Sequence, residues 1–321
     1  MSKEHVNHSD IARFADERVN LKRDDAKELR RQGNLLKERL ESYLGDHDHF
    51  ELRKLLLSGS LAKGTALKSG SDLDLACYVS SDSAPDKISE LIDWLAKRLE
   101  TAFANFTADQ IKPKTYSVGV VFKGTGNEFD IVPILYHGDP QWRGYLVSQE
   151  NGERLLTSVP MHLEFIRSRK EKNNTDLAQV IRLIKYWAKL HKQEDEGFRF
   201  KSFMIEMIVC KLADEGVALN DYIEALASFF NYMVTDEFRT SVVFDDYYAP
   251  NSCAATKDPI RIWDPVNCEN NVAKLYTEQN CRKLLDAAMD AAEAIDSALY
   301  STTKGETIRY WQKVFGPNFS A

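Results

Sequence analysis

The sequence of 321 residues lacks the cysteine patterns that would indicate a metal-bound or disulfide-stabilised protein. It contains only five cysteines, an odd number, and none of them has the C-x-x-C spacing of a zinc or redox site. We therefore expect reduced thiols, most of which pack in the interior.

Long apolar runs are missing too. No segment approaches the roughly 18 apolar residues that a membrane span requires. The first residues, MSKEHVNHSDIARF, have no apolar centre like that of a secretory signal. We expect a soluble, cytoplasmic protein with no membrane partner.

Positive charge is not in excess, because 42 Lys and Arg stand against 49 Asp and Glu, a net charge of -7 at pH 7. This balance argues against a protein that coats nucleic acid non-specifically. The basic stretch RSRKEKNN at 167–174 is typical of a solvated helix end or loop, but it leaves binding of nucleic acid open.

The sequence does contain enough apolar residues, 43%, for one large or two packed domains. The first half mixes strand-like alternation with helical periodicity, whereas almost every later segment is helical in pattern. Expected helices span 24–46 and 85–106, and expected strands span 51–58, 73–80, 115–124 and 127–136. We predict an α+β fold in which a mixed-sheet core with an N-terminal helix (1–160) packs against a helical lobe (161–321).

The stretch GSLAKGTALKSGSDLDLACYV (59–79) contains two aspartates separated by one leucine. Asp72 and Asp74 lie at i and i+2 of an expected strand, so their side chains point to the same face. Two carboxylates this close repel each other unless a cation compensates them. Mg²⁺ prefers such oxygen ligands together with water and phosphate oxygens. The pair therefore predicts half of a metal site.

Gly59 and Ser60 open the same stretch. A glycine-containing turn at the start of a helix lets backbone N–H groups and a hydroxyl approach a phosphate closely. The stretch has neither the G-x-x-x-x-G-K-[ST] spacing of a Walker loop nor the G-x-G-x-x-G of dinucleotide binders. We interpret it as a triphosphate site of another kind, next to the aspartates.

Asp130, in NEFDIVPILY, is the candidate for a third carboxylate. Two-metal phosphoryl transfer needs such a group near the ion that activates the attacking hydroxyl. The residue lies in an otherwise apolar strand, where an unpaired buried carboxylate would be costly. The alternative is a strand-end residue that is exposed to water.

The Gly-Ser turn, the S-D-L-D-L motif at 71–75 and the D-I-V-P of 130–133 resemble the DNA polymerase β-like nucleotidyltransferase superfamily. Three later segments are similar to the helical lobe of oligoadenylate synthetases and of the bacterial cGAS/DncV-like nucleotidyltransferases (CD-NTases): RLIKYWAKLH (182–191), FRFKSFMIEMI (198–208) and IWDPVNCENNVAKLY (262–276). Within that branch the chain looks most like clade C, the oligonucleotide cyclases of bacterial CBASS anti-phage defence. The resemblance covers nearly the whole chain and implies a polymerase β-like core with an oligoadenylate synthetase-like lobe.

The resemblance implies a role for each aspartate. Asp72 and Asp74 would hold two Mg²⁺ ions, for which Mn²⁺ is an alternative. Asp130 would complete the metal site and help to deprotonate or position a ribose hydroxyl. The reaction implied is in-line attack of that hydroxyl on the α-phosphate of an NTP, with pyrophosphate leaving.

The resemblance also implies nucleotide-binding residues. The Gly59 backbone and Ser60 would bind the donor triphosphate, and Lys185 and Ser202 match the positions that bind its terminal phosphates in this branch. A helix-borne lysine is a compact charge for phosphate, and a serine at a helix start adds a hydroxyl and free N–H groups. From the sequence alone, Lys185 would instead be a solvated helix residue.

For this clade the resemblance implies ATP as the substrate, with other NTPs open, a cyclic tri-AMP second messenger as the product, and a HORMA-domain protein as the activator. The chain has no Cys/His cluster of a zinc ribbon, so we do not expect a DNA-sensing insert like that of the animal cyclase. Two alternatives remain. One is a nucleotidyltransferase of the same core that modifies a tRNA end, a protein or a small molecule. The other is a non-catalytic nucleotide-binding module, against which the three carboxylates argue.

Overall fold

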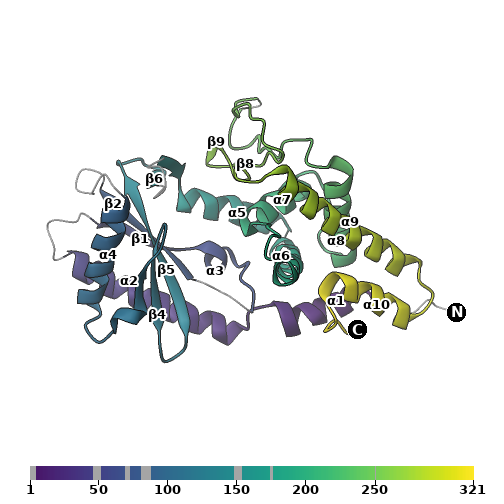
Figure 1. The fold of residues 1–321 in the computed structure, drawn as a ribbon, viewed down its shortest axis with the longest axis horizontal. Helices are drawn as coiled ribbons and strands as arrows, with labels where there is room; N and C mark the ends of the chain where they lie inside the picture. Colours follow the sequence, from purple (N-terminus) through teal and green to yellow (C-terminus); the bar gives the residue numbers. More distant parts are fainter. Residues whose placement is uncertain are drawn as a thin grey trace. The chain divides into compact units, whose positions relative to one another are not determined.

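The computed structural model describes residues 5–45, 52–68, 73–80, 88–147, 154–173, 176–249 and 251–321 (Figure 1). The chain divides into two compact units, which we call the sheet unit and the helical unit. The sheet unit comprises Leu21–Ala66 and Gly70–Phe165, and the helical unit comprises Met1–Asn20, Leu67–Ser69 and Ile166–Ala321. The domain boundary expected between residues 160 and 161 stays a prediction, because compactness alone does not show which segments fold independently.

The sheet unit is built on a mixed sheet, which confirms the α+β class. Its strands are ordered β1-β2-β5-β4-β3, and β6 pairs with both β5 and β7. β2 and β5 run parallel, whereas the other neighbours are antiparallel. The strands are β1 (Leu52–Ser58), β2 (Leu73–Ser80), β3 (Ile111–Pro113), β4 (Val118–Phe122), β5 (Asn127–Tyr136), β6 (Gly144–Val147) and β7 (Arg154–Thr157).

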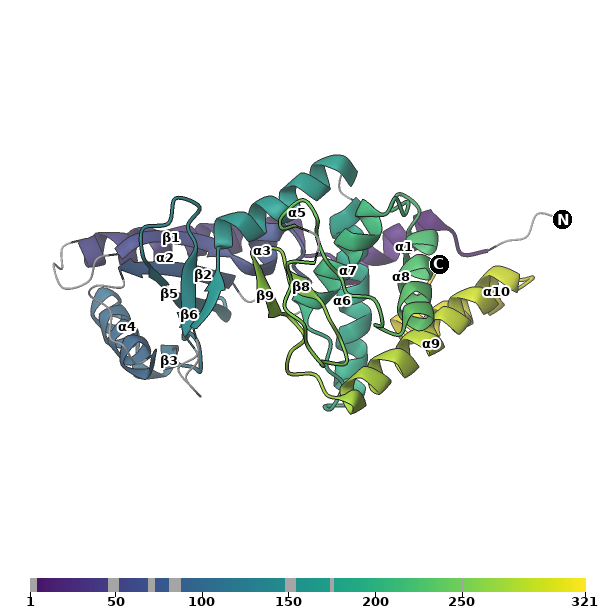
Figure 2. The same cartoon turned by 90° about the horizontal axis from the view of Figure 1, so that it is seen from above.

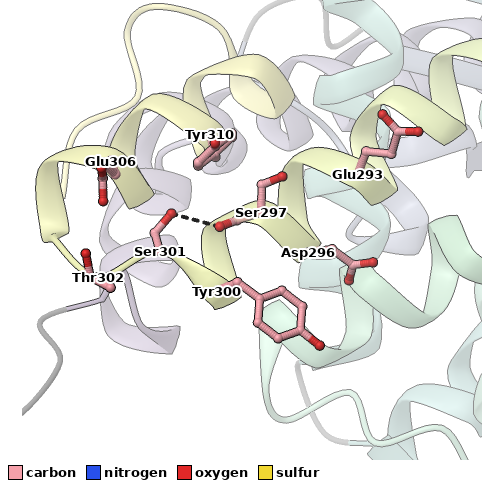
Figure 3. A pocket seen from close by; sticks show the side chains of 8 residues that line it. All are labelled: Glu293, Asp296, Ser297, Tyr300, Ser301, Thr302, Glu306 and Tyr310. Carbon is pink, nitrogen blue, oxygen red and sulfur yellow. Dashed lines mark hydrogen bonds between the residues drawn. The ribbon is translucent and has the colours of Figure 1, made fainter.

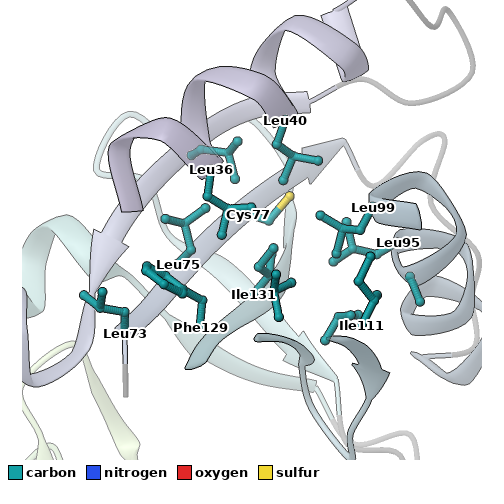
Figure 4. Close-up of a cluster of buried hydrophobic side chains, with 14 of the residues drawn as sticks. Leu36, Leu40, Leu73, Leu75, Cys77, Leu95, Leu99, Ile111, Phe129 and Ile131 are labelled. Carbon is teal, nitrogen blue, oxygen red and sulfur yellow. The ribbon is translucent and has the colours of Figure 1, made fainter. Parts of the chain in front are cut away.

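Two helices, α2 (Arg23–Gly45) and α4 (Ile88–Ala102), cover one face of this sheet (Figure 4). The buried side chains between helices and sheet include Leu36, Leu40, Leu73, Leu75, Cys77, Leu95, Leu99, Phe129 and Ile131. Because side chains alternate along a strand, Asp74 and Asp130 belong to the other face, together with the smaller buried cluster of Ala76, Tyr78 and Ile134. The apolar alternation thus separates a packed face from a face that carries carboxylates.

The expected elements of this unit agree with the structure to within a few residues. The strand expected at 115–124 is shorter, since 114–117 form the turn into β4. The first residues of the helix expected at 85–106 lie outside the described residues. Short elements missed by the sequence pattern are α3 (Gly59–Lys63), η2 (Ala108–Gln110), β3, β6 and β7.

The helical unit contains α1 (His8–Phe14), the π-helical turn η1 (Ala15–Val19), most of α5 (Val159–Asn173), α6 (Asp176–Glu194), α7 (Ser202–Asp214), α8 (Tyr222–Asp236), α9 (Glu278–Tyr300) and α10 (Lys304–Phe315). The expectation that nearly every segment after residue 160 is helical is wrong between α8 and α9. There the short strands β8 (Trp263–Asp264) and β9 (Asn267–Asn271) pair (Figure 2). Asp264 accepts a hydrogen bond from the backbone N–H of Val266, and Asn271 accepts one from that of Ile262, so these side chains satisfy the backbone in place of a helix.

All five cysteines are free, and Cys77, Cys210 and Cys281 are buried, in agreement with the expected packing role. Burial raises the pKa of the Cys77 thiol to about 12, so it is uncharged at neutral pH. Among the described residues, no helix combines the length and the apolar composition that crossing a membrane would demand.

Candidate active site

Strand pairing brings two of the three predicted carboxylates together. Asp74 on β2 is the register partner of Asp130 on the parallel strand β5, and neighbouring strands lie about 4.8 Å apart. Both residues are partly buried. Asp72, the first aspartate of the motif, lies outside the described residues. We call Asp74 and Asp130 the carboxylate centre.

Gly59 touches the carboxylate centre from the end of β1. Its φ of 65° lies in the left-handed region, which favours glycine. A Cβ at this position would come within 1.7 Å of Oδ2 of Asp74 and 2.7 Å of its Cγ. A side chain at position 59 would therefore overlap the Asp74 carboxylate, and only glycine lets the backbone pass this close to it.

Ser60 stands in the first turn of α3, directly after this glycine. Its carbonyl oxygen accepts a hydrogen bond of 2.8 Å from the N–H of Thr65, a fully buried residue. Gly64, with a φ of 74°, ends the helix in the left-handed conformation. The tight β1–α3 connection fixes the backbone of Ser60 next to the strand end at which Asp74 lies.

Asp130 has a positive partner that sequence reasoning missed. The ammonium of Lys114 lies 2.8 Å from Oδ1 of Asp130 and 2.5 Å from Oε1 of Glu128, and the hydroxyl of Ser117 donates to the same Oδ1 at 3.2 Å. Burial disfavours the charged lysine, but the hydrogen bonds to both carboxylates outweigh it and raise the pKa of Lys114 above its ordinary value. The alternative of a water-exposed strand end is wrong, since the Asp130 side chain is 20% exposed within β5.

These residues fit a divalent cation held by oxygen. Two carboxylates on neighbouring strands belong to the oxygen donors that Mg²⁺ prefers. Among the described residues no three His, Cys, Asp or Glu side chains are grouped closely enough to hold a metal. Asp72, the first of the three predicted carboxylates, falls outside that part of the chain.

The two phosphate-binding residues predicted in the helical unit lie on α6 and α7. Lys185 is 8% exposed, so the alternative of a solvated helix residue is wrong. Ser202 is the first residue of α7, and the residue before it, Lys201, makes no side-chain cap. The partial positive charge at this helix start favours an anion next to Ser202.

Positive charge gathers at this start of α7, which sequence reasoning also missed. Lys201 donates from Nζ to the carbonyl of Val272 at 3.0 Å. Burial, followed by the positive charges of Arg199 and Lys274, lowers the pKa of Lys201. We call Arg199, Lys201 and Lys274 the basic cluster. The R-F-K-S run at 199–202 was the available signal, but Lys274 comes from a distant segment.

The basic stretch at 167–174 contains a structural residue rather than a fully solvated end. Arg169 is 2% exposed and binds Asp214 at 2.6 Å and Asp246 at 3.0 Å. Its guanidinium also lies 5.2 Å from the ring centroid of Phe244. Arg169 therefore joins α5 to α7 and to the loop after α8.

A hollow of about 610 Å³ lies at the turn from α9 to α10 (Figure 3). It is lined by Glu293, Asp296, Ser297, Tyr300, Ser301, Thr302, Glu306 and Tyr310. Its carboxylates would repel a triphosphate, so it is not a candidate for the nucleotide.

Comparison with known proteins agrees with this geometry. Residues 36–123 match the family model described as Nucleotidyltransferase domain. The chain is 53% identical over 319 residues to the cyclic AMP-AMP-AMP synthase of Escherichia coli strain MS 115-1, an alignment that covers 99% of both sequences.

Solved structures extend the likeness to the whole fold. CdnC of E. coli MS115-1 in complex with HORMA-deltaN has a TM-score of 0.93 at 52% identity, over 100% of both chains. CdnC with ATP also has a TM-score of 0.93, at 53% identity, over 99% of this chain and 100% of that one. Vibrio cholerae DncV cyclic AMP-GMP synthase has a TM-score of 0.73 over 99% of this chain and 98% of its own, and at 10% identity it shows the fold alone. With 53% identity along almost its whole length, the chain belongs to the CD-NTase family of nucleotidyltransferases, with the CBASS oligonucleotide cyclases.

Proposed function

We propose that the protein synthesises a cyclic oligonucleotide second messenger, cyclic tri-AMP, from ATP in anti-phage signalling. The observation that carries the proposal is the pairing of Asp74 with Asp130 beside Gly59 in a chain that is 53% identical to a cyclic AMP-AMP-AMP synthase. A binding module without catalysis would not require two facing carboxylates on β2 and β5. We further propose that the protein acts in the cytoplasm.

Asp72, Asp74 and Asp130 would hold two Mg²⁺ ions, or Mn²⁺ in their place. The ions would supply charge neutralisation at the phosphates and a lower pKa for the attacking hydroxyl. Asp130, held through Oδ1 by the hydroxyl of Ser117, would orient its other oxygen toward the ribose hydroxyl and take up its proton.

The remaining roles belong to groups that bind the triphosphate. The backbone at Gly59 and the hydroxyl of Ser60 would hold the donor phosphates next to Asp74, whose carboxylate lies against Gly59. Lys185, Ser202 and the positive end of the α7 dipole would bind the terminal phosphates, supported by the basic cluster. Position and charge would supply most of the rate enhancement.

A HORMA-domain protein is the activator that we propose, because the similar CdnC has been solved in complex with HORMA-deltaN. Binding of nucleic acid stays open as an additional requirement. The buried Arg169 removes one cation from the stretch that suggested it.

The test is to incubate the purified protein with each NTP, alone and mixed, in Mg²⁺, with and without a HORMA-domain protein and with and without DNA. We expect a phosphatase-resistant product with the mass of cyclic tri-AMP, made from ATP and dependent on the HORMA protein. The Asp72→Asn, Asp74→Asn double variant is the inactive control. Linear products alone, or label transferred to tRNA or protein, would overturn the cyclase assignment.

A further inference from the structure

Lys114 reaches the carboxylate centre along a path that the fold leaves open for it. The residue begins the turn between β3 and β4, where its backbone N–H donates to the carbonyl of Ser117 at 2.8 Å. Its side chain crosses Gly119, at which a Cβ would come within 2.8 Å of Cε of Lys114. Gly119 is the register partner of Asp130. Glycine at this position of β4 therefore makes room for a lysine that ends on the third carboxylate.

We propose that Lys114 is an internal counter-cation of the metal site: its ammonium holds Asp130 while no divalent ion is bound, competes with that ion, and so sets the metal concentration that the enzyme needs. The inference rests on the proposed function insofar as Asp130 is taken to be a metal ligand.

Charge supports the competition. Glu128 and Asp130 lie two residues apart on β5 and share a face of the sheet, and Asp74 is opposite Asp130 on β2. Asp130 thus has a carboxylate on either side, and neighbouring carboxylates repel one another in the absence of a cation. Lys114 supplies one positive charge at 2.5 Å from Glu128 and 2.8 Å from Asp130. A divalent ion on Asp130 would be attracted by the same carboxylates and repelled by this ammonium.

The second partner makes the exchange easy. When Asp130 turns to a metal ion, the ammonium still has Glu128, so the lysine is not left without a counter-charge. Both side chains are accessible enough to move, with exposed fractions of 38% for Lys114 and 40% for Glu128. The hydroxyl of Ser117 can keep its hydrogen bond to Oδ1 of Asp130 during the change.

A second lysine of the sheet unit shows what an ordinary surface pair looks like. Lys123 lies 3.1 Å from Asp109, with exposed fractions of 55% and 64%. Asp109 is not one of the carboxylates of the proposed metal site. An ion pair as exposed as Lys123–Asp109 contributes little to stability. Lys123→Met is therefore the matched control for Lys114→Met.

The experiment measures Mn²⁺ binding to the nucleotide-free protein by electron paramagnetic resonance of the free ion, in wild type, Lys114→Met and Lys123→Met. We expect Lys114→Met to bind Mn²⁺ about tenfold more tightly, because the repulsion between the ion and one positive charge a few ångströms away is removed. Its melting temperature should be lower without metal and should rise more on adding Mn²⁺. Lys123→Met should match wild type in Mn²⁺ affinity. An unchanged or weaker affinity in Lys114→Met would overturn the proposal.

Two further variants separate the possible reasons for a failure. Lys114→Arg keeps the positive charge and should retain the wild-type affinity for Mn²⁺. Agreement of this variant with wild type would show that the charge, and not merely a substitution at position 114, sets the affinity. In an Asp130→Asn background, Lys114→Met should no longer tighten binding. Equal tightening there would mean a general charge effect and would also overturn the proposal. Because Mn²⁺ binding is measured without nucleotide, a product other than cyclic tri-AMP would leave this result standing.

Discussion

The two charged regions of the molecule are assembled in different ways. In the sheet unit, Asp74 and Asp130 are neighbours because two parallel strands fix their register, and each strand has a clear apolar alternation. In the helical unit, the basic cluster joins the start of α7 to Lys274, which follows the irregular β8–β9 segment. Charges set by strand register can be inferred from a short motif. Charges brought together by loops require the fold itself.

If the carboxylate centre is the catalytic one of the two charged regions, Asp74→Asn should have the largest effect on activity. We expect turnover of ATP to fall by at least about 10³-fold, since loss of several kcal/mol of metal-based stabilisation has that size. The melting temperature should not fall, because a charge that faces Asp130 is removed. Asp93→Asn, on the exposed side of α4, should keep wild-type activity. Near-wild-type turnover in Asp74→Asn would refute the metal assignment.

Gly59→Ala should have the next largest effect. The added Cβ would overlap Oδ2 of Asp74 at 1.7 Å, and the left-handed φ would add strain. We expect turnover to drop by about 10²-fold, the size reported for an ångström-scale misplacement in an active site. Turnover is measured at saturating ATP and HORMA protein.

Gly138→Ala is the matched control for this substitution. Gly138 also has a positive φ, 89°, but nothing lies within 4 Å of its added Cβ. It should lose stability through strain and keep its activity. If both variants lose activity equally, backbone strain rather than contact with Asp74 explains the effect.

The sequence predicted the framework of the sheet unit well because its elements are long and regular. The bounds of β2 and β5 match the expected strands, since each has a buried alternating face. It also predicted that Asp130 would need a partner, but not that the partner is Lys114, because a turn residue has no periodicity that shows where its side chain ends.

The helical unit was predicted less completely. The periodicity of α6 and α7 predicted both helices, but it could not show that Lys185 is buried. The segment between α8 and α9 was misread, because Asp264 and Asn271 stabilise it through side chain–backbone hydrogen bonds that leave no periodic pattern. The Lys201–Lys274 proximity depends on that segment.

Lys201→Met tests the basic half of the comparison. We expect the KM for ATP to rise by about tenfold with a smaller change in kcat, as for the loss of one charge-assisted contact to phosphate of about 1.5 kcal/mol. Folding lowers the pKa of Lys201, so the unfolded chain binds the lysine proton more strongly than the folded chain does. At neutral pH the charged Lys201 therefore lowers the free energy of unfolding. The melting temperature should therefore be maintained in the variant.

The pH dependence of ATP binding gives a second measurement on Lys201. The pKa of Lys201 in the folded protein is below the ordinary lysine value, so Lys201 loses its charge at a lower pH than an ordinary lysine. The affinity of wild type for ATP should therefore weaken as the pH rises through that range, and the affinity of Lys201→Met should not. Lys211→Met, at the other end of α7 in an i,i+4 pair with Glu215, is the control and should bind ATP normally. An unchanged KM in Lys201→Met would remove the basic cluster from the nucleotide site.

Arg169→Met should have the smallest effect on turnover and a large effect on stability. It therefore distinguishes a positive charge that stabilises the helical unit from the charges proposed to bind ATP. The guanidinium is buried, but Asp246 is 54% exposed and can be rehydrated. We therefore expect a decrease of about 2–3 kcal/mol in the free energy of unfolding, somewhat less than for a fully buried pair. Urea denaturation measures this decrease. Arg239→Met is the control, because its ion pair with Glu237 is exposed, and it should change stability by less than about 0.5 kcal/mol.

At a temperature where Arg169→Met stays folded, its KM for ATP should equal that of wild type. A raised KM in the folded variant would place Arg169 with the basic cluster instead.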